Sequence, residues 1–338
     1  MNPDNWQERH KQFSTALDAD QVEVQAMLAG AANIEVGIED ERMAGVVDDA
    51  LIENGNSWEE RQVVLETLSG AIAEEVDRRS AMMKQAYPFE ITKGGALSYR
   101  RSRSGVYEFC LAAALNPAGE AAGAPKASAV FELIARDVLA SHLGDGARGF
   151  RAGAPSYDFE RRGNSARETF LALEKQCGEF RWCPEAGYPN EPTFKHLRDV
   201  GLDIVAWKPW LDGRLGQLFA VGQCACGKND VDASKGRELS LGRLGIWLRP
   251  MCHAAPLRCF FVAHHIPNTM ELYAISKDAG VVFDRARMAL IAESSADRVK
   301  SCEGIDYHKM AQMYANPRVV QPVLAQPRQT VVVAPRCQ

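Results

Sequence analysis

The sequence predicts an α/β (α+β) fold in which helices flank a mixed sheet and an all-helical region precedes it. Apolar residues recur at three- and four-residue spacing over much of residues 8–86, which is the period of amphipathic helices. Two β-rich runs, residues 201–210 and 217–225, stand on either side of Asp212 and Gly213, a pair that often closes β-hairpins. A chain of 338 residues is long enough for about two domains.

The composition is that of an ordinary globular protein, with 46% hydrophobic and 25% charged residues. Apolar runs are shorter than the ~20 residues that span a bilayer, and the first residues are polar. We therefore expect a cytoplasmic protein that makes no membrane contact. Nine cysteines, an odd number without C-x2-C spacing, indicate reduced thiols rather than disulfides or structural zinc.

Charge is unevenly distributed along the chain. Residues 1–90 contain 19 acidic and 7 basic side chains, whereas residues 91–338 contain 25 acidic and 32 basic ones. A basic excess in the later part is typical of a segment that meets a polyanion such as DNA. Solvated faces of opposite sign would give the same pattern, so both interpretations stay open.

The clearest helices of the first 90 residues are 21–30 and 58–83. Asn56 and Ser57 supply an N-cap before the second helix, and Pro88 ends the helical region because proline disfavours a helical predecessor. We place a domain boundary near residue 90. Residues 1–90 are expected to bind a partner, to regulate, or to mediate homo-oligomerisation.

The later part alternates between helical and extended patterns. Residues 89–92 and 96–99 are predicted strands around a Lys93-Gly94-Gly95 turn, and 259–264 is a predicted buried strand. Helices are predicted for 107–115, 128–143, 165–178 and 234–248. Asp284 follows a short apolar run and is expected to cap a helix. An α/β domain over 91–317 is thus followed by a Pro-rich tail, 318–338.

Three short motifs fall on these elements in order. Phe131 and Glu132 open an amphipathic helix, residues 199–205 (DVGLDIV) carry Asp199 and Asp203 into a strand, and residues 222–225 (GQCA) end the next strand. This order of elements and motifs resembles the αβββαβ core of the PD-(D/E)XK nuclease superfamily, in its Mrr-like restriction endonuclease branch. The resemblance covers roughly residues 130–265.

The resemblance implies a restriction-endonuclease-like fold and a site that contains Glu132, Asp203 and Gln223. It also implies that these residues bind Mg2+ or Mn2+ and that the protein cleaves DNA, as an endonuclease of a restriction or phage-defence type. Residues 1–90 would then contact other subunits of a defence system.

The hairpin geometry supports the pairing of Asp203 with Gln223 independently. If Asp212 and Gly213 form the turn, the numbers of facing residues sum to about 425. Asp203 then lies opposite Gly222 and beside Gln223, and Gln223 shares a face with Ala225. A carboxylate and an amide oxygen would meet there, and hard cations such as Mg2+ prefer oxygen ligands.

The superfamily pattern places a catalytic lysine where this chain has Ala225. Lys228 in the following loop is our preferred substitute, with Lys208 on the neighbouring strand as the other choice. Without either, the chain would be an inactive nuclease-fold protein that binds DNA or assembles a complex. A purely structural or interaction protein is the third alternative.

Two further groups of residues are candidates for contact with nucleic acid or metal. Arg100, Arg101 and Arg103 combine cations with nearby tyrosines, as nucleic-acid surfaces do, although a surface loop has the same composition. His264 and His265 end a predicted strand, where they would bind metal or phosphate, or serve as hydrogen-bonded structural residues.

Overall fold

The computed structural model describes residues 4–34, 58–116, 125–152, 166–188, 201–226, 238–251, 254–300 and 304–315. The helices are α1 (Asp4–Ala29), α4 (Trp58–Met83), the 3-10 turn η1 (Lys84–Ala86), α5 (Val106–Leu115), α6 (Ala127–His142), α7 (Ala166–Cys177), α10 (Leu241–Gly245), α11 (Thr269–Ala279), α12 (Arg285–Ser294), α13 (Ala296–Lys300) and α14 (Tyr307–Tyr314). The strands are β1 (Ala31–Asn33), β2 (Phe89–Ile91), β3 (Ala96–Tyr99), β4 (Arg148–Arg151), β5 (Phe180–Trp182), β6 (Ile204–Lys208), β7 (Leu218–Ala225), β8 (Leu248–Pro250), β9 (Leu257–Val262) and β10 (Val281–Phe283).

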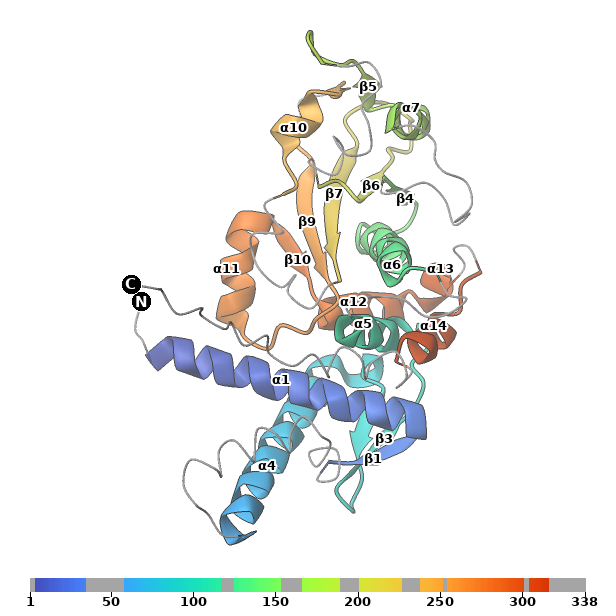
Figure 1. The fold of residues 1–338 in the computed structure, drawn as a ribbon. Helices are drawn as coiled ribbons and strands as arrows, with labels where there is room; N and C mark the ends of the chain where they lie inside the picture. Colours follow the sequence, from blue (N-terminus) through green and yellow to red (C-terminus); the bar gives the residue numbers. More distant parts are fainter. Residues whose placement is uncertain are drawn as a thin grey trace, which may run out of the picture.

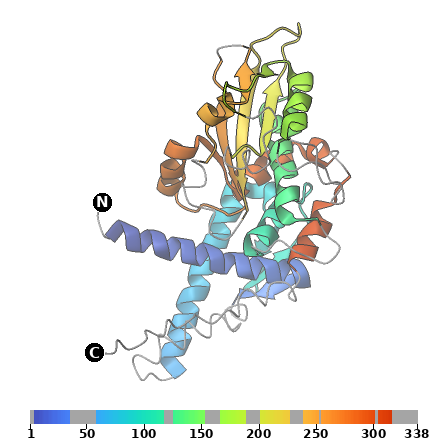
Figure 2. The same ribbon diagram turned by 45° about the horizontal axis from the view of Figure 1, so that its top comes forward.

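A mixed five-stranded sheet forms the upper half of the molecule (Figures 1 and 2), with strand order β10-β9-β7-β6-β4. β4, β6 and β7 are antiparallel neighbours, whereas β7, β9 and β10 run parallel. The helices α5 and α12 lie below this sheet, and α1, α4 and the small sheet β1-β3-β2 lie below them (Figure 1). The predicted mixed sheet with flanking and preceding helices is therefore confirmed at this coarse level.

The β6–β7 hairpin is present, but its register is one residue from the predicted one. Ile204, rather than Asp203, lies opposite Gly222. β6 ends at Lys208 and β7 begins at Leu218, so Asp212 and Gly213 belong to a loop of residues 209–217 instead of a two-residue turn. Gly213 has a positive φ of 69° and its N–H donates to the carbonyl of Trp210. The pair makes a local turn inside this loop.

Several predicted elements are confirmed with nearly the expected bounds. α4, α5, α6 and α7 occupy the predicted segments, and β2 and β3 form the predicted hairpin. Asp284 caps α12, because its side chain accepts a hydrogen bond from the N–H of Arg287. These segments have strong local patterns, so their sequence alone defines them.

Other elements differ from the prediction. Residues 1–90 are not all-helical, because β1 pairs with β3. β4, which pairs with β6, is a strand that the sequence pattern does not predict. Within the predicted helix 234–248, the described part forms only α10, after which β8 pairs with β5. Strands of three or four residues are too short to show alternation, and partners far away in the sequence stabilise them.

The two faces of the sheet contact different apolar clusters. Ile204, Ala206 and Ala220 pack with α5, α6 and α12 in the main cluster. The alternate residues Val205 and Val221 pack with α7 and with the segment around α10. Successive side chains of a strand point to opposite faces. Membership of a cluster therefore gives the face to which a strand residue belongs.

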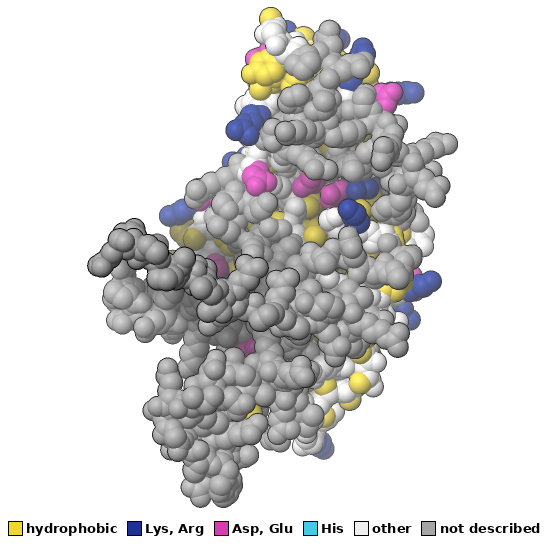
Figure 3. Space-filling model, in the orientation of Figure 1, with side chains coloured by type: hydrophobic (Ala, Val, Ile, Leu, Met, Phe, Trp, Pro, Cys, Tyr) yellow, Lys and Arg dark blue, Asp and Glu magenta, His cyan; other side chains and the backbone are white. Residues whose placement is uncertain are grey.

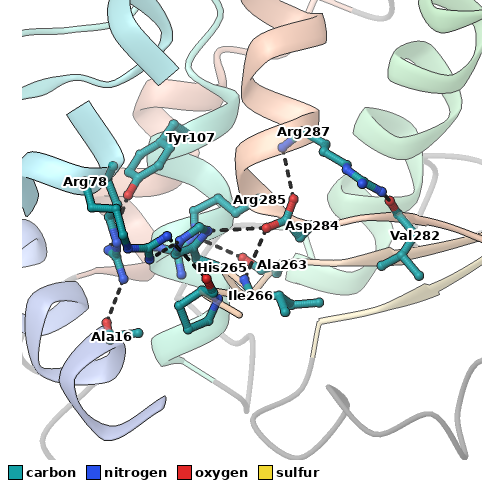
Figure 4. A network of polar contacts seen from close by, with 12 residues as sticks. Ala16, Arg78, Tyr107, Ala263, His265, Ile266, Val282, Asp284, Arg285 and Arg287 are labelled. Carbon is teal, nitrogen blue, oxygen red and sulfur yellow. Dashed lines mark hydrogen bonds and ion pairs between the residues drawn. The ribbon is translucent and has the colours of Figure 1, made fainter. Parts of the chain in front are cut away.

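A buried ionic network joins the N-terminal helices to the sheet domain. Arg79 of α4 is fully buried and contacts Asp20 and Glu23 of α1, at 2.7 Å each. Arg285 of α12 contacts Asp20 at 2.6 Å, and Tyr107 donates to Glu23. Figure 4 shows Tyr107 of α5, Asp284 and Arg285 at the start of α12, and His265 from the segment after β9 lying close together.

In this network, some of the acidic side chains of residues 1–90 are buried and paired with arginines. α1 and α4 also contribute side chains to the same main apolar cluster as α5. The boundary predicted near residue 90 therefore separates elements that share one core. Among the described residues, no helix has the length and hydropathy needed to cross a bilayer. The predicted tail, 318–338, lies outside the described residues.

Candidate functional site

Two strands and one helix bring charged side chains together at one end of the five-stranded sheet. Glu132 comes from α6, Arg151 is the last residue of β4, and Asp203 directly precedes β6. The strand register places Arg151 opposite Ile204, and the N–H of Ala152 donates to the carbonyl of Asp203 at 2.7 Å. The backbone thus fixes Arg151 and Asp203 as neighbours.

Glu132 and Arg151 form a close ion pair. Arg151 Nε lies 2.5 Å from Glu132 Oε2, and both side chains are mostly buried, with 11% of Arg151 and 16% of Glu132 exposed. Burial raises the pKa of Glu132, whereas the charge of Arg151 and its hydrogen bond lower it. Burial outweighs the guanidinium, so the net shift is upward.

Asp203 is held by backbone groups of β7. Its Oδ2 accepts a hydrogen bond of 2.7 Å from the N–H of Cys224, and its own N–H donates to the carbonyl of Gly222 at 3.0 Å. Burial raises the pKa of Asp203 to about 7, and the charge of Glu132 adds to this rise. Two carboxylates that disfavour each other's ionisation are a site where a cation would be stabilised.

Gln223 lies on the other face of the sheet from Glu132. Its neighbour Gly222 faces Ile204 in the main cluster, so alternation directs Gln223 toward the face of Val221. There its Nε2 donates to Glu238 Oε2 at 2.9 Å, and its Oε1 accepts from the N–H of Leu239 at 3.2 Å. Both polar ends of the Gln223 amide thus have protein partners.

Glu238 is a member of the site that the sequence reasoning missed. Its side chain is exposed, it accepts from Gln223, and its charge contributes to the raised pKa of Asp203. Residue 238 falls within a predicted helix, where a glutamate is usually solvated. Only its position before α10 and next to the end of β7 connects it with Asp203.

Cys224 faces the same side as Glu132. It packs against the main apolar cluster, and burial raises the pKa of its thiol well above the usual range. The charges of Asp203 and Glu132 add to that rise, which places the thiol in their electrostatic field. Cys224 is therefore protonated at neutral pH and a weak nucleophile.

Lys208, the alternative of the two predicted lysines, does not lie at these carboxylates. Lys208 lies at the opposite end of β6, where its Nζ donates to the carbonyl of Asp145. Lys228 and Asp199 lie outside the described residues. Ala225, where the sequence resemblance would place a lysine, is buried in a third apolar cluster with Phe260 and other side chains of β9 and α11.

The arginines predicted to bind nucleic acid are exposed on the loop between β3 and α5. Arg101 lies 3.5 Å from Asp306 and Arg103 lies 3.8 Å from Asp297, with 59% and 64% of the two arginine side chains exposed. Exposed pairs at these distances contribute little stability. The three guanidinium groups are therefore accessible to an anionic ligand.

The histidine pair is buried under α4 and α12. His265 Nδ1 lies 3.3 Å from Asp284, and its Nε2 lies 3.1 Å from Arg78 Nη2. Burial lowers the pKa of His265, although Asp284 opposes this shift. For His265, these contacts agree with a hydrogen-bonded structural role rather than with binding of metal or phosphate.

Glu132 and Asp203 offer carboxylate oxygens, the donors that a hard divalent cation prefers. Figure 3 shows acidic side chains beside basic ones on the molecular face over the sheet. Within the described part of the chain, no three His, Cys, Asp or Glu side chains are grouped closely enough to hold a metal ion. Mg2+ is commonly bound through one or two carboxylates, with water and phosphate oxygens as the other ligands. Glu132 and Asp203 fit a site of that kind.

The comparisons with known proteins found no match to this chain among protein-family models, curated proteins or solved structures.

Proposed function

We propose that this protein is a metal-dependent DNA endonuclease of a restriction or phage-defence type, which hydrolyses phosphodiester bonds with Mg2+ or Mn2+. The observation that carries the proposal is that Glu132 and Asp203 both lie beside the end of β4: Glu132 pairs with the Arg151 side chain, and the carbonyl of Asp203 accepts from the N–H of the following residue, Ala152. These two residues belong to separate sequence motifs, about 70 positions apart, and each motif independently predicts a carboxylate at the site.

The order of elements supports the same proposal. In chain order, α6, β4, β6, β7, α10 and β9 give helix, three strands, helix and strand, the αβββαβ order of the PD-(D/E)XK core, with α7 and β5 inserted after β4 and β8 inserted after α10. β4, absent from the prediction, supplies the first strand of that order. In the antiparallel β4-β6-β7 unit, Asp203 lies at the same end of the sheet as Arg151, which supports the proposal.

The residues of the chain have separate roles in the proposed reaction. Glu132 and Asp203 would hold the divalent ion through carboxylate oxygens, and the N–H of Cys224 orients the Asp203 carboxylate. A bound divalent ion supplies a water of lowered pKa and offsets charge on the phosphate. Hydrolysis adds the hydroxide to phosphorus and breaks the bond to the leaving sugar oxygen, which takes up a proton from water.

A cleavage assay on the full-length chain tests the proposal directly. Supercoiled plasmid is incubated with the protein and Mg2+, Mn2+ or EDTA, and nicked and linear products are measured. The proposal expects cleavage with either ion and none with EDTA. Mn2+ binding, measured by electron paramagnetic resonance, is expected in the wild type and weakened in Asp203→Asn. An absence of both binding and cleavage would reject the nuclease.

A second candidate is a catalytically inactive nuclease-fold protein that binds DNA or assembles a defence complex. Two observations favour it: Ala225 stands where the superfamily has lysine, and the amide of Gln223 is engaged by Glu238 and Leu239. This candidate expects DNA binding without cleavage under every metal condition. The same plasmid assay, combined with a gel-shift assay, distinguishes the two candidates.

DNA is the proposed substrate or ligand in both cases. The exposed Arg100, Arg101 and Arg103 and the basic excess of residues 91–338 support a polyanionic partner. Contacts with other defence subunits, or with a second copy, are proposed for the N-terminal helices on the surface that does not face the core.

A further inference from the structure

The candidate site needs a cation that the superfamily pattern does not supply here. Ala225 has no charge, and it points into an apolar cluster on the face away from Glu132. Lys208 is held at the far end of β6 by the carbonyl of Asp145. The transition state of phosphodiester cleavage gains negative charge, and an aimed donor lowers its free energy.

Arg151 already lies where such a cation is required. It ends β4, in register with Ile204, and the next residue donates its N–H to the carbonyl of Asp203. Its neighbour Phe150 packs in the second cluster, so alternation directs Arg151 toward the face of α6. The strand therefore fixes the guanidinium beside Glu132 and Asp203.

The Arg151 side chain can serve more than one acceptor. A guanidinium carries five N–H donors in a planar fork, and the bond to Glu132 Oε2 uses Nε. Such forks match the spacing of carboxylate and phosphate oxygens. Because only 11% of the side chain is exposed, its charge is poorly screened by water and acts strongly on groups in the site.

Resting on the proposed function, we propose that Arg151 is the cation of the active site that replaces the missing lysine. In the metal-free protein Arg151 balances the charge of Glu132. When Glu132 and Asp203 bind the divalent ion, Arg151 donates to a non-bridging oxygen of the scissile phosphate and stabilises the charge that develops there. Arg151 thus changes its main acceptor while β4 stays in place.

The test compares Arg151→Gln and Arg151→Lys with the control Arg148→Gln, all in the full-length chain. Arg148 lies on the same strand but is exposed, so its replacement removes the same charge outside the site. Two quantities are measured: single-turnover plasmid cleavage with Mn2+, and the Kd for Mn2+ from electron paramagnetic resonance.

Arg151→Gln is expected to slow cleavage by a factor on the order of 10²–10³. The same change should tighten Mn2+ binding about threefold or more, because a positive charge beside the two carboxylates is removed. Arg151→Lys should keep part of the rate and the wild-type Kd. Arg148→Gln should change neither quantity by more than about twofold. Slower cleavage together with tighter Mn2+ binding would show that the lost rate does not come from a lost metal ion.

Each contrary outcome has a separate meaning. If Arg151→Gln binds Mn2+ and cleaves like the wild type, the role of Arg151 is overturned while the nuclease stands. If both Arg151 variants lose their circular dichroism and cooperative unfolding, the arginine is structural and the inference is overturned. If the wild type neither binds Mn2+ nor cleaves, the proposed function fails first and the inference fails with it.

Discussion

The Asp203 carboxylate accepts a 2.7 Å hydrogen bond from the backbone N–H of Cys224, so the start of β6 is tied to the end of β7 by a side chain. The bond fixes the orientation of Asp203 before any ligand binds. Asp203 therefore has two properties that can be tested separately: it accepts this hydrogen bond, and it carries a negative charge when ionised. An amide oxygen in its place would still accept the bond but would carry no charge. Asparagine and alanine at this position therefore test different things.

Asp203→Asn should abolish Mg2+-dependent cleavage while the protein remains folded. The amide oxygen keeps the bond to Cys224, whereas the charge that is proposed to bind the ion is lost. We expect a loss in rate on the order of 10³ or more, with wild-type circular dichroism. Asp203→Ala should lose activity equally but be less stable by about 1 kcal/mol, because the Cys224 N–H loses its partner.

The exposed Asp212 in the hairpin loop provides the matched control. Asp212→Asn makes the same chemical change outside the site and should leave cleavage unchanged. An Asp203→Asn protein that cuts DNA at the wild-type rate would remove Asp203 from the reaction. One that unfolds would make it a structural aspartate instead.

The raised pKa of Asp203 predicts a pH-dependent difference in stability. The folded protein has a pKa of about 7 at this group, against an ordinary value of 3.8, so it retains a proton that the unfolded chain releases. The stabilisation of the folded state that depends on protonated Asp203 is complete below about pH 4 and is lost as the pH rises through 7. Asp203→Asn removes this loss and should be the more stable protein at pH 8.

Relative to the wild type, Asp203→Asn should gain about 2 kcal/mol more in its free energy of unfolding at pH 8 than at pH 5. This value is reduced for residual solvent exposure of Asp203. Urea unfolding in EDTA at both pH values measures it. Equal differences at pH 5 and pH 8 would mean that Asp203 is already ionised at the lower pH. Mn2+ binding should tighten over the same pH range, because protons compete for the carboxylate.

The sequence predicted those parts of the fold and site whose patterns are local. α4 and the Asp284 cap follow from helix periodicity and capping residues. Glu132 and Asp203 follow from motifs, and the structure brings them into one electrostatic neighbourhood. Arg151 and Glu238 could not be found this way, because β4 and the segment before α10 acquire their positions only from distant strands.

The register shift has a simple physical origin. The prediction treats the Asp-Gly pair as the whole turn, although the loop between β6 and β7 contains nine residues, 209–217. Burial of Val205 and Trp207 on one face, with Ile204 and Ala206 on the other, decides the register instead. The packing of the sheet therefore outweighs the local turn preference.

Arg79→Met should destabilise the whole protein by about 3–5 kcal/mol. Arg79 is fully buried against Asp20, Glu23 and Glu75, so its loss leaves buried carboxylates uncompensated. Urea unfolding followed by circular dichroism and tryptophan fluorescence measures the change. Because the network also contains Arg285, we expect the N-terminal helices and the sheet domain to unfold in one transition.

The adjacent Arg78 is the control for that measurement. Its side chain is 41% exposed and pairs with Glu75, so Arg78→Met should lower stability by only about 1 kcal/mol. Equal losses in the two variants would contradict the buried network as the link between the two parts. A separate early transition of the helices in Arg79→Met would show that the sheet domain is stable without them.

Replacement of Arg100, Arg101 and Arg103 by glutamine should weaken DNA binding and its dependence on salt. If all three contact phosphates, the slope of log K against log salt should become shallower by about 2–3. Fluorescence anisotropy with a labelled duplex at several salt concentrations measures this slope. The full chain is used, because removal of residues 1–90 would take Asp20 and Glu23 away from Arg285.

A charge-matched control removes three exposed lysines from other elements, namely Lys84, Lys126 and Lys277. It should reduce affinity only through net charge and leave the slope within about 1 of the wild-type value. If the two triple variants have the same slope of log K against log salt, the loop between β3 and α5 is not the DNA-binding surface. The predicted interface would then have to be sought elsewhere on residues 91–338.

Restoring the superfamily lysine should fail. Ala225 is 5% exposed, and it is surrounded by Phe260, Val262 and Ile275 on the face away from Glu132. Ala225→Lys would bury an ammonium group among apolar side chains, which costs several kcal/mol, of order 3 or more. We therefore expect lower stability in urea and no recovery of cleavage when Ala225→Lys is combined with Arg151→Gln. Ala225→Met, similar in length but uncharged, separates the effect of charge from that of volume and should be markedly less destabilising. Recovery of cleavage by the lysine would mean that the end of β7 can rotate toward Glu132. A lysine at residue 225 could then supply the same positive charge as Arg151.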